Sequence, residues 1–381
     1  MSAVRRGASA AADPATAARE LAAQINGAET GSVVFFCSAQ YDLDVLGAEL
    51  RDRFEDVELI GCSTAGEIGT DGYASHSLVG LGFARADYVT TAGHIEDLSV
   101  ASLVRATDLV GSLVRKLQLR APGANAANTF ALLLIDGLSG VEEPVLSAIA
   151  RELGDIPIVG GSAGDNLRFR ETVIFHDGEF RASSAVLMLV HTWLPFDVFK
   201  TQHIVSSDVK MVVTEADPVR RVVMEINAEP ASKEYARLVE VEGRALAPML
   251  LATHPLQVRV GGDDYTRSIR NVNEDGSLTF YCAIDEGIVL AAGRGIDMIA
   301  DLDRLFERIA RNVGETDAIL GFDCIFRRLE LQERNLERAA SRLLRRNNVV
   351  GFSTYGEQYH AMHLNQTFSG VAFGRDPAAR A

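Results

Sequence analysis

The sequence lacks most of the features that would assign a chemical activity. Its four cysteines, Cys37, Cys62, Cys282 and Cys324, are scattered and form no C-x-x-C pair, which predicts reduced thiols and no disulfide framework. No G-x-G-x-x-G opens a helix after a strand and no Walker sequence is present, so nucleotide binding has no motif support. No apolar run approaches the roughly 20 residues of a membrane span, and no apolar segment follows the first basic residues as in a secretory signal. We therefore expect a cytoplasmic protein without a membrane span.

The composition is that of an ordinary globular protein. The chain has 381 residues, of which 47% are hydrophobic and 23% charged, and this length suggests two domains with a large core. Its formal net charge of −15 argues against an electrostatic nucleic-acid binder.

Three segments share one pattern: a short apolar run, Gly-x-Ser, a small or turn residue, then Gly and an acid. We call them the signatures, and they span Val57–Glu67, Ile156–Asp165 and Asn348–Glu357. Each is preceded by an apolar strand that enters a helical stretch, over Ser32–Cys37, Thr129–Ile135 and Ala318–Phe322. This repetition predicts an α/β fold of two domains, with mixed sheets built from repeated strand–helix–strand units.

The signatures have two readings. The first is a tight turn in which glycine lets the backbone curl and the serine hydroxyl satisfies local amides. The second is a cradle in which the turn amides hold an anion or ligand. The candidate cradle residues are Gly61, Ser63, Gly160, Ser162, Gly351 and Ser353.

Ser162 also lies in a literal G-x-S-x-G, Gly160–Gly164. A nucleophile elbow needs a helix directly after the serine, whereas Asn166–Phe175 is predicted to return to a strand. We therefore predict that the chain is not an enzyme, and a hydrolase that uses Ser162 is the least favoured alternative.

Five further predictions concern the rest of the chain. The first 13 or so residues are predicted to be a tail, and Asp13-Pro14 opens a helix through Ile25. A domain boundary is expected near Asp217-Pro218, followed by a helix over Val219–Asn227. Another helix, Ile325–Arg346, has a basic exposed side that suits either solvent or an acidic partner.

Two motifs resemble those of the FIST family of intracellular sensory proteins: GCSTAGEI near the N-terminus and GFSTYGEQY near the C-terminus. The resemblance covers Gly31 to Gly374. It implies a tail and helix over residues 1–30, a FIST N-terminal domain over 31–217, a FIST C-terminal domain over 218–375 and a tail over 376–381.

The segments around His203 and Lys210–Pro218 are similar to the nitric-oxide-sensing NosP branch of that family. This resemblance implies haem b, with His203 as the axial ligand of the haem iron, a diatomic gas ligand and a partner sensor histidine kinase. The preferred function is therefore a cytosolic haem-based sensor of nitric oxide that regulates this kinase in signal transduction. A single histidine ligand leaves one face of the iron open for a gas. His191 and Cys282 are the alternative ligands, and a hydrogen-bonded strand histidine is the simpler reading of His203.

The alternative function is a haem-free sensor of a small metabolite such as an amino acid. In that case, the signature residues and buried polar groups would hold its carboxylate or amine. The sequence identifies neither the kinase, nor the direction of regulation, nor the oligomeric state. His360 and His363 stand outside any cluster typical of a zinc site.

Overall fold

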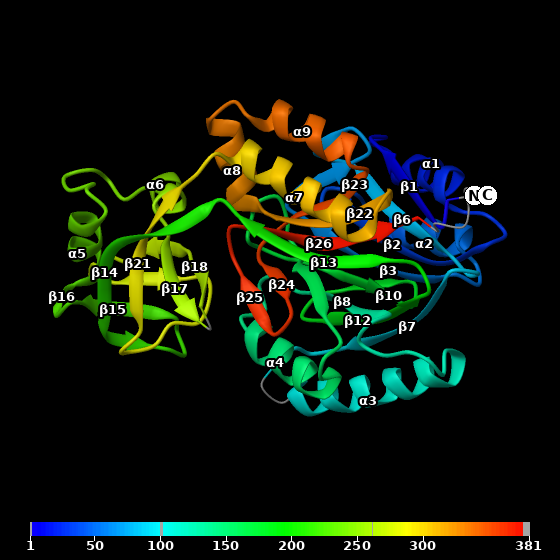
Figure 1. Ribbon diagram of the computed structural model, residues 1–381, viewed down its shortest axis with the longest axis horizontal. Coiled ribbons are helices and arrows are strands. Elements are labelled where there is room, and N and C mark those ends of the chain that lie inside the picture. The colour runs from blue at the N-terminus through cyan, green and yellow to red at the C-terminus, as the bar shows by residue number, and fades with distance from the viewer. Residues whose placement is uncertain (1, 100–101, 261, 376–381) are drawn as a thin grey trace.

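The structure is a computed structural model that describes residues 2–99, 102–260 and 262–375. The chain forms a larger lobe, which holds the first and last described strands, and a smaller lobe made from residues 204–295 (Figure 1). The larger lobe holds three six-stranded sheets, and the smaller lobe holds one eight-stranded sheet. No helix in the described ranges combines the length and the apolar character that crossing a membrane requires.

The three large sheets have the same construction. The first has the order β1 (Val4–Ser9), β6 (Leu78–Ala84), β2 (Thr30–Ser38), β3 (Glu58–Thr64), β10 (Ile174–His176), β11 (Glu179–Arg181). The second has the order β7 (Tyr88–Ile95), β12 (Ala185–Thr192), β8 (Thr129–Ile135), β9 (Ile158–Ser162), β24 (Glu357–Tyr359), β25 (Met362–Leu364). The third has the order β13 (Phe196–Gln202), β26 (Thr367–Gly374), β22 (Thr316–Cys324), β23 (Val349–Thr354), β4 (Glu67–Gly69), β5 (Gly72–Ala74).

Each sheet is completed by a hairpin from another part of the chain. We define three units, residues 4–84, 88–192 and 196–374, each with a central parallel strand pair: β2–β3, β8–β9 and β22–β23. The hairpin β4–β5 of the first unit pairs with β23 of the third unit. In the same way β10–β11 of the second unit pairs with β3, and β24–β25 of the third pairs with β9. The exchange therefore forms a closed ring of three units, which confirms the predicted α/β fold of repeated strand–helix–strand units.

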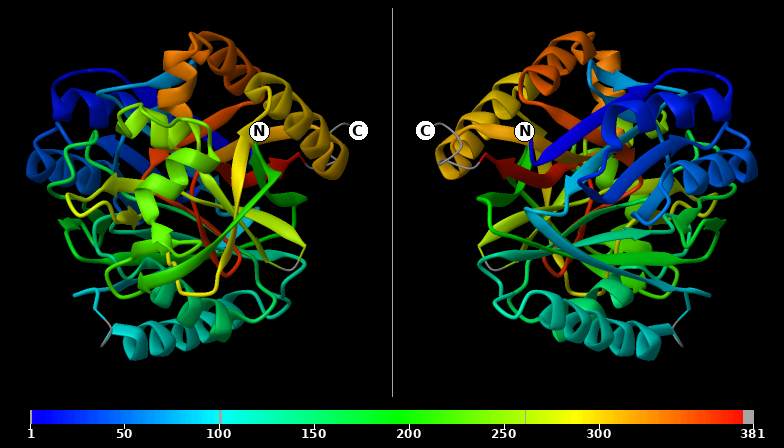
Figure 2. Two further views of the ribbon diagram at one scale, coloured as in Figure 1. Left: turned by 90° about the vertical axis from the view of Figure 1, so that its left-hand side faces the viewer. Right: turned by 90° about the vertical axis from the view of Figure 1, so that its right-hand side faces the viewer.

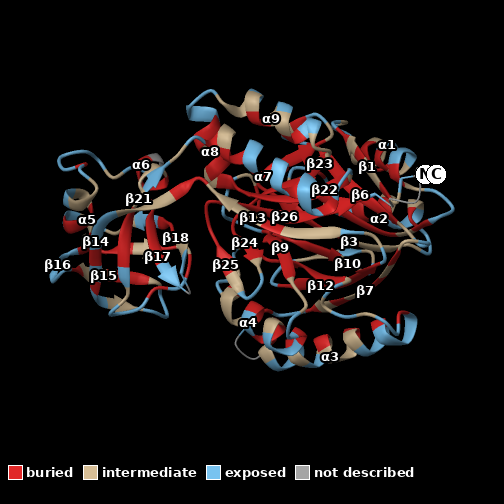
Figure 3. Cartoon of the chain, viewed as in Figure 1, coloured by how far each residue is buried: buried red, intermediate tan, exposed pale blue. Residues whose placement is uncertain are grey.

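Helices cover the outer face of each sheet (Figure 2). They are α1 (Pro14–Ile25) and α2 (Leu43–Arg53) on the first, α3 (Ser102–Arg120) and α4 (Glu142–Leu153) on the second, and α7 (Met298–Val313), α8 (Ile325–Glu333) and α9 (Glu337–Arg346) on the third. The inner faces of the three sheets meet in one buried core (Figure 3). Phe36 of the first unit packs on Phe322 and Phe352 of the third, with ring centroids 6.1 and 4.6 Å apart.

The smaller lobe is an insertion in the third unit, between β13 and α7. Its elements are β14 (Ile204–Asp217), β15 (Val222–Ile226), β16 (Glu229–Pro230), α5 (Ala231–Leu238), α6 (Pro248–Thr253), β17 (Leu256–Val260), β18 (Asp263–Arg267), β19 (Ile269–Val272), β20 (Leu278–Phe280) and β21 (Val289–Gly295). Antiparallel β14 and β21 connect it to the larger lobe, pairing from Ile204 and Gly295 outward (Figure 1). The lobe has its own core, which includes Met211, Tyr235 and Leu290.

These lobes divide the chain differently from the predicted segments 31–217 and 218–375. The last part of the chain, from α7 to β26, returns to the larger lobe. The boundary at 217–218 thus stays a prediction about family domains. The predicted end segment 376–381 lies outside the described residues, whereas residues 2–30 of the segment 1–30 are described.

Three local predictions need correction. The expected N-terminal tail contains β1, because its backbone pairs with β6. Gly7 of this strand packs closely on α1: a Cβ at this position would lie 2.8 Å from Cγ2 of Ile25. Residues 219–227 form β15 and its preceding turn, since pairing with β14 and β20 overrides a helical spacing of apolar residues. The basic helix Ile325–Arg346 is broken into α8 and α9 at Asn335, whose φ of 57° is the left-handed conformation that ends helices.

The helix predicted after Asp13-Pro14 is confirmed as α1. The Asp13 side chain accepts a hydrogen bond from the amide of Thr16, as an N-cap does.

Candidate functional site

The ends of the three signatures meet in the centre of the larger lobe. There, each signature serine offers its backbone carbonyl oxygen to the next unit. The bonds run from the amides of Ala65 to Ser353 (3.0 Å), Gly164 to Ser63 (3.1 Å) and Tyr355 to Ser162 (3.2 Å). The serines therefore help to close the ring of three units.

The six candidate cradle residues lie inside strands, not in turns. Gly61, Gly160 and Gly351 are in β3, β9 and β23, without positive φ, and a Cβ on each would collide with the neighbouring strand. For Gly351 the obstacle is the carbonyl oxygen of Gly321, 1.7 Å away. Close strand approach, rather than turn geometry, requires glycine here.

The three serine side chains are buried. The hydroxyl of Ser63 accepts a hydrogen bond from the amide of Val173 (3.0 Å), and that of Ser162 accepts one from Gln358 Nε2 (3.0 Å). The Ser353 hydroxyl has no hydrogen-bond partner among the described residues. None of the six cradle residues lines the cavity described below, and their role as ligand contacts stays a prediction.

His203 lies between β13 and β14, where the chain passes from the larger lobe to the smaller one. Its ring is fully buried, and both nitrogens are engaged: Nε2 lies 2.7 Å from Glu330 Oε2, and Nδ1 lies 2.8 Å from Arg327 Nη1. Because the guanidinium can only donate, Nδ1 accepts and Nε2–H donates to Glu330. Burial lowers the pKa of His203, which favours this neutral ring.

The other two predicted haem ligands are also buried. His191, in β12, has Nδ1 3.4 Å from the Thr129 hydroxyl, and its ring packs against Trp193. Cys282 has Sγ 3.1 Å from Asn365 Oδ1, and burial raises the pKa of its thiol, which disfavours a thiolate. None of the three predicted haem ligands lines the interlobe cavity described below.

The arrangement around His203 therefore does not fit an axial haem ligand, because no ring nitrogen is left for iron. In residues 2–99, 102–260 and 262–375, no group of three or more His, Cys, Asp and Glu side chains could hold a metal ion. The predicted haem b stays a prediction that binding measurements must decide.

A cavity of about 440 Å³ lies between the two lobes. The larger lobe contributes the loop after β8, the start of α4, the loop after β9, and residues that follow β23 or lie in β25. In Figure 1, α4 and β25 face the smaller lobe. The smaller lobe contributes the β14–β15 turn and residues of and near β19 and β20. Lining residues include Glu142, Phe169, Arg170, Arg221, Arg270, Tyr281, Tyr355 and His363.

One wall of this cavity is an aromatic stack. The rings of Phe169 and Tyr355 are stacked with centroids 4.9 Å apart. The Tyr355 hydroxyl donates to Asp165 and accepts from the amide of Leu167 (2.8 Å). Burial opposes ionisation of Asp165, but hydrogen bonds from Tyr355 and the amides of residues 169–171 hold its pKa below its usual range. The second and third signatures are thereby fixed to each other at the cavity wall.

Arg221 ties the smaller lobe to the larger one across the cavity. Its guanidinium donates to the carbonyl oxygen of Tyr281 in its own lobe, and Nη2 donates to the carbonyl oxygen of Gly140 (3.1 Å). The same nitrogen lies 3.1 Å from Glu143 and 3.5 Å from Glu142. Glu143 also accepts a hydrogen bond from the amide of Ala283 (2.8 Å). These contacts hold the two lobes together at the start of α4.

The cavity carries an excess of positive charge. Four lining arginines, Arg170, Arg220, Arg221 and Arg270, face a single lining carboxylate, Glu142. In the part of the chain that the structure describes, the guanidinium groups of Arg170 and Arg270 form no hydrogen bond and no ion pair. Burial raises the pKa of Glu142 to about 7, although Arg221 opposes this shift. An anionic ligand is therefore favoured over a cationic one.

His363 also lines the cavity, and its imidazole is neutral. Burial, together with the positive charges of Arg221 and Arg267, lowers its pKa to about 3. Its Nδ1 lies 3.4 Å from Gln358 Nε2.

Sequence reasoning missed most of this site. The lining residues lie between positions 137 and 363 without a common spacing. One signal was present: two residues after the serine, the third signature has Tyr355 where the first has Ala65 and the second has Gly164.

Comparison with known proteins gives two domain matches and three weaker likenesses. The FIST N domain matches residues 32–229, and the FIST C domain matches residues 231–360. An uncharacterized protein of Methanocaldococcus jannaschii is 24% identical over 360 residues, which cover 83% of this chain and 67% of that protein.

Two solved structures are similar at low level. For a cyanuric acid hydrolase from A. caulinodans, the aligned region covers 50% of this chain and 71% of the hydrolase chain, with 13% identity and a TM-score of 0.27. Another cyanuric acid hydrolase covers 97% and 99% of the two chains, with 9% identity and a TM-score of 0.39. Likenesses this weak carry no functional argument.

Proposed function

The chain belongs to the FIST family, whose domains are sensors in signal transduction, and we propose that it senses a small carboxylate-bearing metabolite, such as an amino acid. The ligand binds in the interlobe cavity. The protein acts through a partner rather than through chemistry of its own.

The observation that carries this proposal is the pair of unengaged arginines, Arg170 and Arg270, on opposite lobes of one cavity. Guanidinium groups bind carboxylates through two parallel hydrogen bonds. The aromatic rings of Phe169, Tyr355 and Tyr281 offer apolar contact for the body of the ligand. Among the described residues that line the cavity, Glu142 is the acidic group that could receive an amine.

A ligand in this position would change how the lobes are held. It contacts both lobes and competes with Glu142 and Glu143 for Arg221. Binding therefore stabilises one relative orientation of the lobes, which is the population shift that a sensor requires. The partner histidine kinase expected from the family resemblance remains a prediction, as does the cytoplasmic location.

The haem-based nitric oxide sensor is the competing hypothesis. Protein purified with adequate haem should show an intense Soret band at stoichiometric haem if that hypothesis holds. The engaged ring of His203 favours the metabolite sensor.

Calorimetric titration of the haem-free protein with the standard amino acids and simple dicarboxylates tests the proposal. At least one should bind, and Arg170→Ala with Arg270→Ala should weaken it about 10- to 100-fold, because charge-assisted hydrogen bonds are worth about 1.5–3 kcal/mol. Arg259→Ala is the matched control, since this arginine of the smaller lobe is exposed and meets Asp264 only at 4.0 Å. Failure of every acid to bind, or equal binding by the double variant, would contradict the proposal.

A further inference from the structure

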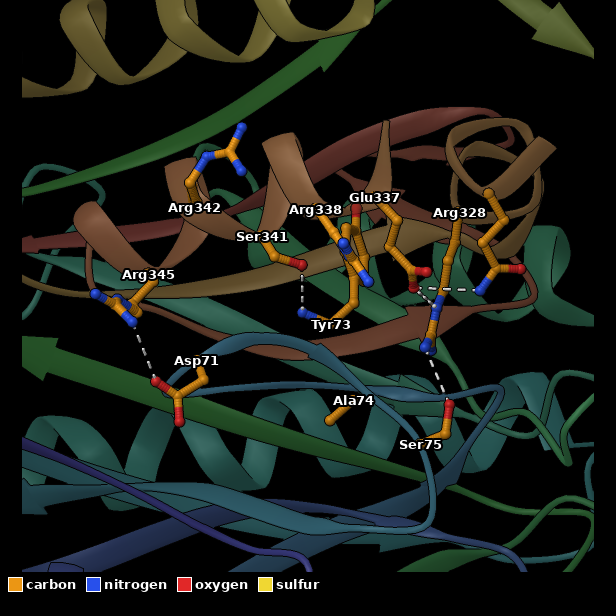
Figure 4. A pocket seen from close by; sticks show the side chains of 11 residues that line it. Asp71, Tyr73, Ala74, Ser75, Arg328, Glu337, Arg338, Ser341, Arg342 and Arg345 are labelled. Carbon is orange, nitrogen blue, oxygen red and sulfur yellow. Dashed lines mark hydrogen bonds and ion pairs between the residues drawn. The ribbon is translucent and has the colours of Figure 1, made fainter. Parts of the chain in front are cut away.

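A second hollow, which shares no lining residue with the interlobe cavity, lies beside α9. It is a groove of about 590 Å³ between α8–α9 and the hairpin β4–β5 (Figure 4). Its charged and polar lining includes Asp71, Ser75, Arg328, Arg338, Arg342 and Arg345. The groove lies between helices of the third unit and the hairpin of the first unit that pairs with β23.

Two of its arginines have partners within the protein. Arg328 is nearly buried, with Nε 3.2 Å from Glu337 and Nη2 donating to the Ser75 hydroxyl (3.0 Å). Arg345 meets Asp71 at 3.7 Å, but both side chains are mostly exposed, so this pair adds little stability.

The other two arginines are available. Arg338 and Arg342 are exposed, and across the described ranges they form no hydrogen bond or ion pair; no dashed line reaches either in Figure 4. Arg338, Arg342 and Arg345 stand at i, i+4 and i+7 on α9, so they form one row about 10 Å long. Such a row matches carboxylates spread over about three residues of an extended segment.

The helix beside the groove also reaches the smaller lobe. Phe326 of α8 packs edge-on against Tyr281, a cavity residue, with centroids 5.3 Å apart. The next residue, Arg327, donates a hydrogen bond to His203, where the chain passes between the lobes, and the following residue, Arg328, lines the groove. One short helix thus contacts the cavity wall, the interlobe crossing and the groove.

We propose that this groove is the output surface of the protein and binds an acidic segment of a partner protein. The acidic chain as a whole, with its net charge of −15, repels nucleic acid, so a locally basic groove suits carboxylates presented by a protein. Glu337 and Asp71 in the same groove can receive backbone amides or a basic residue of that segment. The proposal does not require the interlobe ligand.

Fluorescence anisotropy tests this proposal. A labelled peptide with glutamate at alternate positions is titrated with the full chain. Measurements are made at an ionic strength of about 0.05 M, where screening remains modest. The same peptide with glutamine at those positions, and a single-stranded oligodeoxynucleotide of equal length, are the comparison probes.

The variant is Arg338→Glu with Arg342→Glu. Its matched control is Arg115→Glu with Arg311→Glu, two exposed arginines on α3 and α7 that change the net charge by the same amount. We expect the glutamate peptide to bind the wild type and the control alike and the groove variant at least about 10-fold more weakly, a loss of about 1.4 kcal/mol. Thermal unfolding confirms that both variants fold.

Three outcomes overturn the proposal: no binding of the glutamate peptide to the wild type, equal weakening by the control variant, or equal binding of the glutamine peptide. Stronger binding of the oligonucleotide at the same arginines would assign the groove to nucleic acid instead.

Discussion

Replacing Gly351 by alanine adds one methyl group where β23 lies against β22. The added Cβ would lie 1.7 Å from the carbonyl oxygen of Gly321, 2.7 Å from its carbonyl carbon and 3.0 Å from its nitrogen. All three atoms are backbone in the centre of a six-stranded sheet, so no side chain can rotate away. Relief requires the two strands to separate by more than 1 Å over the contact, which weakens their parallel ladder and the core beneath it.

Overpacking in a well-packed core costs about 1–3 kcal/mol, and a backbone obstacle puts this site at about 3 kcal/mol. Unfolding entropy is about 2.1 cal/mol/K per residue, so 381 residues that unfold together give about 0.8 kcal/mol/K. The melting temperature followed by circular dichroism should therefore fall by about 4 °C, and further for Gly351→Val.

Gly123→Ala is the control for this prediction. Gly123 has an ordinary φ, and an added Cβ would meet no atom within 4 Å, so its effect should stay within about 0.5 kcal/mol. If Gly351→Ala melts like Gly123→Ala, the close approach of β22 and β23 does not exist as described.

Three further changes test the lobe contacts. Arg221→Ala should reduce the free energy of unfolding by about 2 kcal/mol, because it leaves the buried Glu142 without its cation, and hydrogen exchange at the start of α4 should increase. Burial raises the pKa of Glu142 to about 7, above its unfolded value of about 4.3, so its contribution to stability is lost as pH rises through that window. Glu142→Gln should therefore gain stability relative to wild type from pH about 4.3 to about 7, as denaturant titrations would show; a constant difference contradicts this. His203→Ala should lower the melting temperature, because Glu330 Oε2 loses its donor and the buried Arg327 Nη1 loses its acceptor. If the wild type binds haem, an unchanged Soret band in the variant excludes His203 as its ligand.

Local sequence predicted those elements whose determinants are local. Asp13 and Pro14 define the start of α1, because an N-cap and a first-turn proline act within a few residues. The repeated apolar strands and the three signatures predicted the repeated units, since buried parallel strands must be apolar throughout.

Elements that depend on distant partners were predicted poorly. Val222 and Val223 have neighbours spaced as in a helix, yet they pair with β20 residues Thr279 and Leu278. The turn Asp177-Gly178 joins the short hairpin β10–β11, which pairs with β3 of another unit. No property of residues 174–181 alone specifies that pairing.

The candidate site was largely out of reach for the same reason. Arg170, Arg270 and Glu142 become neighbours only when the smaller lobe is placed against α4. The predicted haem ligands His203, His191 and Cys282 are buried within protein contacts, and their role as ligands stays a prediction.

The exchange of hairpins leaves strand edges unpaired while the chain is being synthesised. When the first unit leaves the ribosome, β3 has an open edge until β10–β11 arrives more than 100 residues later, and β4–β5 waits for β23, which is about 280 residues away. Open edges of apolar strands recruit other chains, and contacts between such distant residues form slowly. The nascent chain is thus exposed to misassembly until translation is nearly finished, and fragments that end before β23 should depend on chaperones or aggregate.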